Sequence, residues 1–154
     1  MSANDAESEI QQPAQLHVVI VTGDKAVYDG MADRVIAPAL TGQISVLRHH
    51  APLLAALEPG ELIVRLGDSE EDFAIGGGFI EVRDNQVIVL ADTVERAEEI
   101  DVARAEAARR RAQRLIRMYR NRPEFAAAAQ ALRRSRARLR VAQHQASHRS
   151  RRGQ

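Results

Sequence analysis

Residues 79–90 read FIEVRDNQVIVL, and this stretch decides the fold class of the N-terminal part of the chain. Two runs rich in β-branched and aromatic residues, Phe79–Val82 and Val87–Leu90, flank the pair Asp84-Asn85. Aspartate and asparagine tolerate the left-handed backbone that a tight hairpin turn requires. The stretch therefore predicts two antiparallel strands joined by a short turn.

Strand-like runs of similar length continue outward from this hairpin across residues 16–92. Glycine, proline and aspartate separate them, which is typical of turns. The further runs are Leu16–Val21, Val27–Gly30, Ala32–Ala37, Gly42–Leu47, Leu62–Leu66 and Phe73–Ile75. No helix has room to form between them, which excludes a parallel α/β sheet. Roughly eight to ten short strands of this kind predict an antiparallel sandwich or barrel, and we expect a β-sandwich over residues 16–92.

Three breaker positions inside this region carry specific expectations. Pro38 should close a strand, because proline cannot donate to a central ladder. The pair Pro59-Gly60 indicates a turn. The run Gly76–Gly78 lacks the strand-loop-helix setting of a dinucleotide site, so we expect a bulge or a tight crossover where side chains would collide.

After Asp92 the apolar pattern becomes helical. One seam consists of Ala105, Ala108, Ala112, Leu115 and Tyr119, and a second of Phe125, Ala128, Leu132, Ser135, Leu139, Ala142 and Ala146. The first helix can start anywhere from Asp92 to Asp101, and Pro123 suits the first turn of the second helix. We expect an antiparallel two-helix hairpin over residues 93–143. A disordered leader (residues 1–15) and a basic disordered tail (residues 144–154) should flank the two domains.

The two parts of the chain carry opposite charge, although the formal net charge is only +1. Residues 1–100 hold 18 acidic and 6 basic side chains, whereas residues 101–154 hold 16 arginines and 3 acids. This asymmetry points to macromolecular partners rather than to a self-contained enzyme. The seams are mostly alanine, which buries little apolar area. Two interpretations stay open: the hairpin detaches as a switch, or it remains closed on the sandwich.

The sequence offers no convincing catalytic constellation. The chain has no cysteine, which excludes disulfides and thiolate metal sites. It has no phosphate-binding loop, no His-Glu-x-x-His motif, no calcium loop and no apolar run of about 20 residues. His49 and His50 are adjacent and would chelate a metal poorly, so we expect a structural hydrogen bond instead. We therefore expect a non-catalytic protein without a metal site. Its arginines would meet either an acidic protein partner or, as the alternative, nucleic acid or a ribosome.

Two stretches carry a family resemblance. They are Gly42–Leu54, with the sequence GQISVLRHHAPLL, and Ala74–Ala97, which runs from AIGGGFIEV to VLADTVERA. In this order they resemble the epsilon subunit of the rotary F-type ATP synthase, and the similarity covers residues 16–143. One departure is Arg48-His49, where the family usually has Pro-Gly before the histidine.

The resemblance implies a sandwich that binds the gamma subunit and sits on the membrane c-ring, with Gln43 and His50 as contact residues. It also implies a hairpin that moves between folded-back and extended forms, the latter blocking ATP hydrolysis. Arg133, Arg136 and Arg140 would then meet acidic surfaces of the alpha/beta catalytic hexamer. Such a central-stalk rotor subunit couples proton translocation to ATP synthesis. It is peripheral on the cytoplasmic face of the bacterial inner membrane, touches the membrane only through the complex, and binds no nucleic acid.

Some bacterial members of this family bind ATP on the folded-back hairpin through an Ile/Leu-Asp-x-x-Arg-Ala motif. The run Ile100–Ala105 matches it in full and supplies Asp101 and Arg104. The resemblance places the supporting residues at Glu95, Arg134 and Arg138. No cofactor is required, and ATP would be a regulatory ligand. The alternative is that Asp101 and Arg104 form only a surface ion pair, worth less than about 1 kcal/mol.

Overall fold

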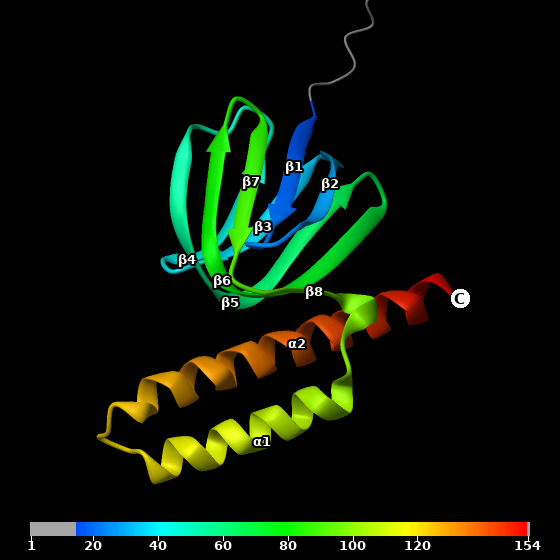
Figure 1. Cartoon of the computed structure of the whole chain (residues 1–154). Helices are drawn as coiled ribbons and strands as arrows, with labels where there is room; N and C mark the ends of the chain where they lie inside the picture. Colours follow the sequence, from blue (N-terminus) through cyan, green and yellow to red (C-terminus); the bar gives the residue numbers. More distant parts are fainter. Residues whose placement is uncertain (1–14, 154) are drawn as a thin grey trace, which may run out of the picture.

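The structure of the chain is a computed structural model that describes residues 15–153. It contains eight strands, one short 3₁₀ helix and two long α-helices (Figure 1). Except for Gln15, the expected leader lies outside the described residues. The elements are β1 (Leu16–Val21), β2 (Ala26–Ala32), β3 (Arg34–Ala39), β4 (Gly42–Leu47), β5 (Leu53–Leu66), β6 (Ser69–Arg83), β7 (Gln86–Ala91), β8 (Val94–Arg96), η1 (Ala97–Glu99), α1 (Val102–Met118) and α2 (Glu124–Arg152).

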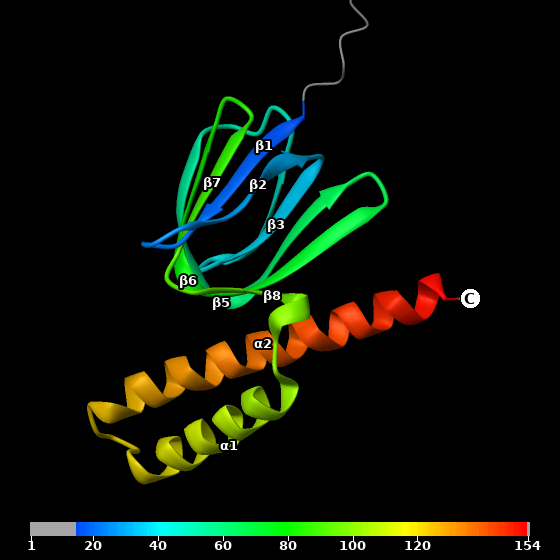
Figure 2. The same cartoon turned by 45° about the vertical axis from the view of Figure 1, so that its right-hand side comes forward.

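The strands follow the order β2-β1-β7-β6-β5-β3-β4, and β8 pairs with β6 outside this path. The long strands β5 and β6 bend, so that the two ends of the path face each other (Figures 1 and 2). One apolar core lies between the two layers and draws side chains from β1, β3, β5, β6 and β7. The predicted β-sandwich followed by a helical hairpin is confirmed. One strand pair differs from the antiparallel expectation, because β1 and β7 run parallel.

The β-hairpin predicted for residues 79–90 forms. The turn between β6 and β7 consists of Asp84 and Asn85, whose φ angles are +50° and +60°. Positive φ at both central residues is the conformation that matches the twist of a two-residue hairpin. Asn85 also anchors a neighbouring loop, because its Oδ1 accepts from the His49 backbone N–H at 2.7 Å.

The glycine run marks the point where β6 changes partners. Residues 73–75 of β6 pair with β8, and residues 78–83 of β6 pair with β7. Gly78 has φ +132°, and a Cβ there would lie 2.0 Å from the Leu90 carbonyl oxygen. The predicted tight crossover at which a side chain would collide is therefore confirmed.

The turn expected at Pro59-Gly60 is wrong. Both residues lie inside β5, where Pro59 pairs with Gly76. A Cβ on Gly60 would lie 2.8 Å from the Pro38 ring, so the glycine makes room for a neighbouring strand. Pro38 itself does not close β3, because the pairing of β3 with β5 is already irregular there and no N–H is needed.

The first helix begins at the last of the expected start positions, with Asp101 as its N-cap, and the second helix runs past its expected end. Residues 94–99 form β8 and η1 against the sandwich, and α1 starts only at Val102. At the other end α2 continues to Arg152, so the disordered tail is wrong for residues 144–152. This last part contacts both η1 and the sandwich: Gln145 donates to Glu98 of η1 at 3.0 Å, and Arg152 donates to the carbonyl of Asp68, between β5 and β6, at 2.7 Å.

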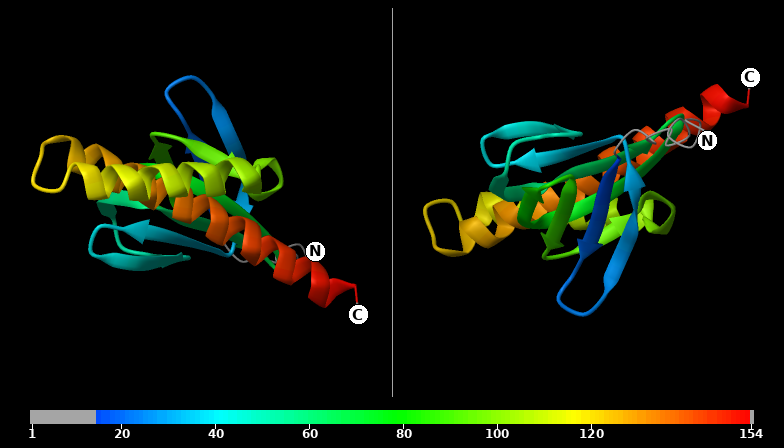
Figure 3. Two further views of the ribbon diagram at one scale, coloured as in Figure 1. Left: turned by 90° about the horizontal axis from the view of Figure 1, so that it is seen from below. Right: turned by 90° about the horizontal axis from the view of Figure 1, so that it is seen from above.

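Helix α2 lies between α1 and the sandwich, across the bent middle part of β5 and β6 (Figures 1 and 3). The expected seam is buried at Ala128, Ser135 and Leu139, whereas Phe125 and Ala146 are exposed. A second buried face, Ala137 and Val141, was not anticipated. It exists because α2 packs on two sides, with Val141 entering a small cluster with Ala74, Ala97 and Ile100. Within residues 15–153, neither helix is both long and apolar enough to cross a bilayer.

Candidate functional site

A pocket of about 620 Å³ opens between the start of α1 and the middle of α2. Three of the five side chains that the resemblance implies lie on the segment from β8 to the first turn of α1, and Arg138 enters from α2. The charged residues that line it are Glu95, Glu99, Asp101, Arg104, Arg111 and Arg138. The pocket thus exists only while α2 is folded back against the sandwich.

The acidic residues of the pocket already have structural partners. Asp101 is the N-cap of α1, and its side chain accepts from the Arg104 backbone N–H at 3.0 Å. This satisfies one of the free donors at the helix start. Glu95 Oε1 accepts from Arg138 Nε at 2.7 Å, and both side chains are about one third exposed. A ligand that binds here has to share or replace that ion pair.

Arg134 is the expected site residue that the structure does not bring into this pocket. It lies one turn before Arg138 on α2 and lines a separate, small pocket with Thr93 and Gly76. Its Cδ is 3.4 Å from the position of a Cβ on Gly76. Only Arg138 lines both pockets, so Arg134 borders the site without forming its wall.

Two charged wall residues were missed by sequence reasoning. Arg111 lies two helical turns after Arg104, which puts both guanidinium groups on one face of α1. The seven-residue spacing could have identified Arg111 from the sequence, but α1 contains many arginines at helical spacing. Glu99 ends η1, an element that the sequence pattern did not predict.

The two residues expected at the c-ring lie at opposite ends of β4. Gln43 is the second residue of the strand, and His50 follows its last residue by three positions. A six-residue strand separates its ends by about 20 Å, so the structure does not bring them together. His50 has the predicted structural hydrogen bond, between its Nδ1 and the Ala51 carbonyl oxygen at 2.6 Å.

Two of the three arginines expected to meet an acidic partner, Arg133 and Arg140, lie against acidic residues of the sandwich. Arg133 Nη1 lies 3.8 Å from Glu58 Oε1. Arg140 borders a pocket that Gln43, Glu58 and Glu61 also line. Arg136 is exposed. In this conformation the basic helix uses the chain's own carboxylates as its counterions.

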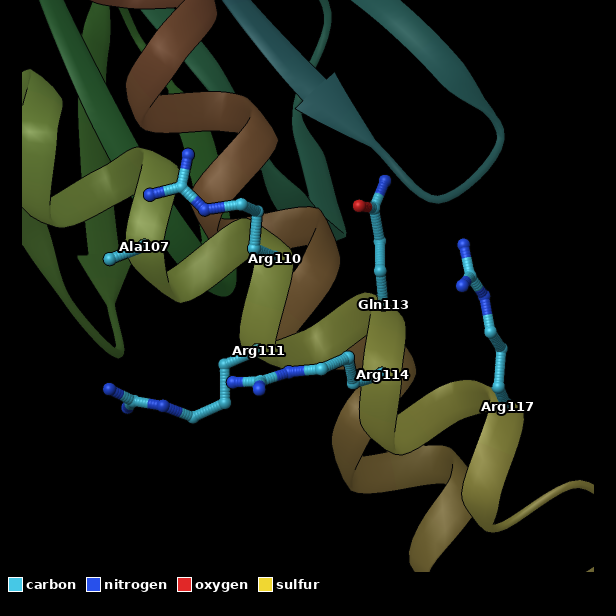
Figure 4. Close-up of a pocket in the computed structure, with 6 residues that line it drawn as sticks. All are labelled: Ala107, Arg110, Arg111, Gln113, Arg114 and Arg117. Atoms are coloured by element: carbon cyan, nitrogen blue, oxygen red, sulfur yellow. The ribbon is translucent and has the colours of Figure 1, made fainter.

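A second cationic surface lies on α1, away from the sandwich. Figure 4 shows four guanidinium groups spread along this helix, and they line an open hollow of about 510 Å³. These residues are Arg110, Arg111, Arg114 and Arg117. The hairpin therefore presents positive charge outward even when folded back.

The contact between the end of α2 and the sandwich contains one perturbed carboxyl group. Burial, and next the negative charge of Glu70, raises the pKa of Asp72 to about 6, while His144 acts in the opposite direction. Asp72 is 8% exposed, and its Oδ2 lies 3.6 Å from His144 Nδ1. This contact therefore contains a carboxyl group whose pKa, about 6, lies well above the ordinary value for aspartate.

The two-part fold corresponds to a known protein class. Residues 15–97 match the family model described as the beta-sandwich domain of the ATP synthase Delta/Epsilon chain. Residues 98–143 match the long alpha-helix domain of the same chain. The class is therefore the ATP synthase Delta/Epsilon chain.

Individual relatives narrow the class further. The ATP synthase epsilon chain of Dehalococcoides mccartyi is 43% identical over 136 residues, which cover 88% of this chain and 97% of the relative. That of Syntrophobacter fumaroxidans is 46% identical over 129 residues, covering 84% and 96%. A chain in the cryo-EM structure of the Euglena gracilis mitochondrial ATP synthase, OSCP/F1/c-ring, has a similar fold, with a TM-score of 0.73, 23% identity and coverage of 94% and 91%. The chain belongs to the ATP synthase epsilon family.

Proposed function

We propose that this chain is a non-catalytic rotor subunit that couples proton translocation to ATP synthesis and restrains ATP hydrolysis through its hairpin. Its partners would be the gamma subunit, the c-ring and, in the inhibitory state, the alpha/beta hexamer. Membership of the epsilon family supports this role over an RNA-binding or ribosome-binding adaptor. The complex would hold the chain at the cytoplasmic face of the bacterial inner membrane.

The observation that supports the inhibitory role is that α2 is held on the sandwich by a small apolar cluster and by partly exposed ion pairs. Such a contact can open and be replaced by contacts with another protein. Its apolar part includes one fully buried valine, Val141, among alanines and Ile100. Its polar part consists of partly exposed ion pairs such as Arg138–Glu95 and Arg133–Glu58. Exposed ion pairs contribute roughly 0–1 kcal/mol each, so acidic surfaces elsewhere can compete for the same arginines.

Truncation of the chain after Ile100 tests the inhibitory role. This end point keeps β8 and η1, which pair with or pack on β6, and removes both α-helices. The assembled ATP synthase with the truncated subunit should hydrolyse ATP faster than the complex with the full chain. Unchanged hydrolysis in a complex of normal composition would refute inhibition by the hairpin.

A cysteine pair gives the matched test within the full-length chain. The chain contains no native cysteine, so Ala74→Cys combined with Val141→Cys introduces the only thiols. These two residues pack in one cluster, and a disulfide there would lock α2 in the folded-back form. Oxidation of the double variant should raise the rate of ATP hydrolysis, and a reductant should restore the inhibition. Neither single cysteine variant should change its rate of hydrolysis on oxidation or reduction.

A second proposal is that ATP binds in the pocket between α1 and α2. The pocket combines three arginines, which can neutralise a triphosphate, with carboxylates that can accept from the adenine amino group or the ribose hydroxyls. Because its walls come from both the α1 segment and α2, a bound nucleotide would stabilise the folded-back form.

Calorimetric titration of the full chain with ATP tests this site. Saturable binding should weaken in Arg138→Ala and in Arg104→Ala. Arg110→Ala serves as the control, because Arg110 lies on the outer surface of α1 and does not line this pocket. Nucleotide binding here would be contradicted if no heat of binding is detected at ATP concentrations up to the millimolar range, or if all three substitutions weaken ATP affinity equally.

The contact residues on the sandwich require separate tests. Because Gln43 and His50 lie at opposite ends of β4, only one of them can sit at the centre of a single small contact with the c-ring. Cross-linking from a cysteine at each position in the assembled complex should identify it. His50, at the end remote from α2, is the one we expect to cross-link.

A further inference from the structure

Five ionisable side chains gather where the last turns of α2 meet the sandwich. Three carboxylates come from the strands, and two histidines lie one helical turn apart on α2. The members of this interface cluster are Glu61 of β5, Glu70 and Asp72 of β6, and His144 and His148 of α2. Both histidines lie beyond residue 143, where the match to the family model ends. The two histidines therefore belong to the part of α2 that extends beyond the family match, whereas the three carboxylates lie in the sandwich.

Three of the possible ligand atoms form a compact triangle. His144 Nε2 lies 3.0 Å from His148 Nε2, which lies 3.3 Å from Glu70 Oε1. The third side, from His144 Nε2 to Glu70 Oε1, is 3.9 Å. A point equidistant from all three atoms lies about 2.0 Å from each, which equals the usual zinc–nitrogen and zinc–oxygen distance of about 2.0–2.2 Å.

The second nitrogen of His144 is oriented as in metal-binding histidines. Its Nδ1 lies 2.8 Å from Glu61 Oε1, and a carboxylate can only accept a hydrogen bond. The proton therefore resides on Nδ1, and the lone pair of Nε2 points toward His148 and Glu70. A carboxylate behind a histidine is the arrangement that fixes the tautomer and strengthens the histidine as a metal ligand.

Glu70 is held in a matching way. Arg65 Nε donates to its Oε2, which leaves Oε1 facing the two histidines. Among the side chains that the structure describes, Glu70 Oε1 and Asp72 Oδ1 are the buried oxygen or nitrogen atoms without a hydrogen-bond partner. The Asp72 side chain is only 6% exposed. Buried polar atoms are normally satisfied, so Glu70 Oε1, which faces the two histidines, calls for a donor or a cation.

The charge of the cluster also favours a cation. The cluster contains three carboxylates, and the one guanidinium paired with them is that of Arg65. A histidine that binds a metal is neutral, so the two imidazoles would add no positive charge. Two negative charges are then uncompensated, which is the charge that one divalent ion supplies. Uncompensated buried charge is costly, and coordination of a metal is one of the ways in which proteins relieve it.

We propose that His144, His148 and Glu70 bind one divalent transition-metal ion of the zinc class, with Glu61 as the outer partner of His144. Two histidines at i and i+4 on one helical face, joined by a carboxylate, leave a fourth tetrahedral position for water. Because the ligands come from α2 and β6, the ion would clamp the end of α2 onto the sandwich. Metal binding would then favour the folded-back form over any form in which α2 leaves the sandwich.

Titration of the metal-free full chain with Zn²⁺, followed by calorimetry, tests the site. One equivalent should bind saturably, and Co²⁺ in its place should give the visible absorption of a tetrahedral centre. His148→Gln removes a ligand at the partly exposed end of the cluster and should abolish this binding. Glu61→Gln should weaken it by about 10-fold, as expected for an outer partner.

His17→Gln is the matched control. His17 also pairs with a carboxylate, Asp29 at 2.6 Å, but lies in β1 outside the cluster. It should leave Zn²⁺ affinity unchanged. The proposal fails if wild type shows no saturable binding, if His148→Gln binds Zn²⁺ as tightly as wild type, or if both variants lose affinity equally. In the first case a proton shared between the two histidines holds the contact instead.

A structural readout separates clamping from adventitious binding. Zn²⁺ should slow amide hydrogen exchange in residues 141–152 of wild type and have no such effect in His148→Gln. Binding that leaves this exchange unchanged would overturn the clamp.

Discussion

Substitution of Val141 by alanine measures how firmly α2 is held on the sandwich. Val141 is 0% exposed and packs against Ala74, Ala97 and Ile100, so it is the bulkiest fully buried anchor that α2 supplies to this contact. Removal of two methylene equivalents costs about 1.6 kcal/mol in transfer free energy. The cavity left behind raises this to about 2.5 kcal/mol. Helix propensity does not enter when α2 stays helical as it leaves the sandwich, so docking should weaken by at least about 2 kcal/mol.

Thiol labelling can report this change directly. The chain has no cysteine, so Ala137→Cys introduces a single reporter, 3% exposed and one turn before Val141 on α2. The thiol reacts only when α2 opens from the sandwich. A loss of about 2 kcal/mol should therefore increase the labelling rate about 30-fold.

The matched control is Val102→Ala, which makes the same chemical change on α1. Val102 is 50% exposed, so its truncation should change the labelling rate less than about 3-fold. Equal acceleration by both substitutions would show that global unfolding exposes the thiol. No acceleration by Val141→Ala would refute the view that this side chain anchors α2.

Three further predictions follow from single positions. Gly78→Ala should lower the free energy of unfolding by more than about 3 kcal/mol in urea titrations, because its Cβ would lie 2.0 Å from a carbonyl oxygen at φ +132°. Asp72→Asn should change the pH dependence of stability in chelator-treated protein. Since the pKa of Asp72 rises from 3.8 to about 6 on folding, the folded state binds the extra proton between these values. Wild type should therefore lose up to about 3 kcal/mol relative to Asp72→Asn as pH rises from 4 to 7, a difference that thermal melts at several pH values can follow. Asp101→Ala should destabilise the start of α1 by about 1 kcal/mol, visible as faster amide exchange in its first turn, because the cap to the Arg104 N–H is lost.

Each of these predictions has a contrasting outcome. Gly42→Ala, at φ +122° but with open space around it, should cost only the backbone strain of about 1 kcal/mol. A similar loss at both glycines would contradict the collision at Gly78. A constant difference between wild type and Asp72→Asn across pH would contradict the raised pKa. Asp101→Asn keeps a capping oxygen and should resemble wild type.

The candidate nucleotide site was predictable in part. Asp101 and Arg104, which the motif ending in Ala105 supplies, both line the pocket between α1 and α2. The sequence did not predict which arginines of α2 enter the pocket, because several arginines of this helix lie at helical spacing and each could face α1. Arg138 enters the pocket and Arg134 does not, and the difference depends on the rotation of α2 about its axis.

The interface cluster was not predictable from local pattern. His144 and His148 lie in a stretch whose basic, polar composition indicated disorder, and they carry no motif with Glu70. Contacts to Glu70, 74 and 78 positions away in sequence, bring them together, and Gln145 in the same stretch contacts Glu98, 47 positions away.

Alternation of apolar residues, turn chemistry at Asp84-Asn85 and the change to helical spacing after Asp92 determined the sandwich and the hairpin, and the distribution of charged residues determined the opposite charge of the two parts. These properties depend on neighbours in sequence, which the chain specifies locally. Tertiary structure alone decided that β5 continues through Pro59-Gly60, that α2 reaches Arg152, and that Val141 faces the sandwich. In each case packing against a distant segment outweighs a local preference, because burial and ion pairing act between residues that the sequence pattern does not connect.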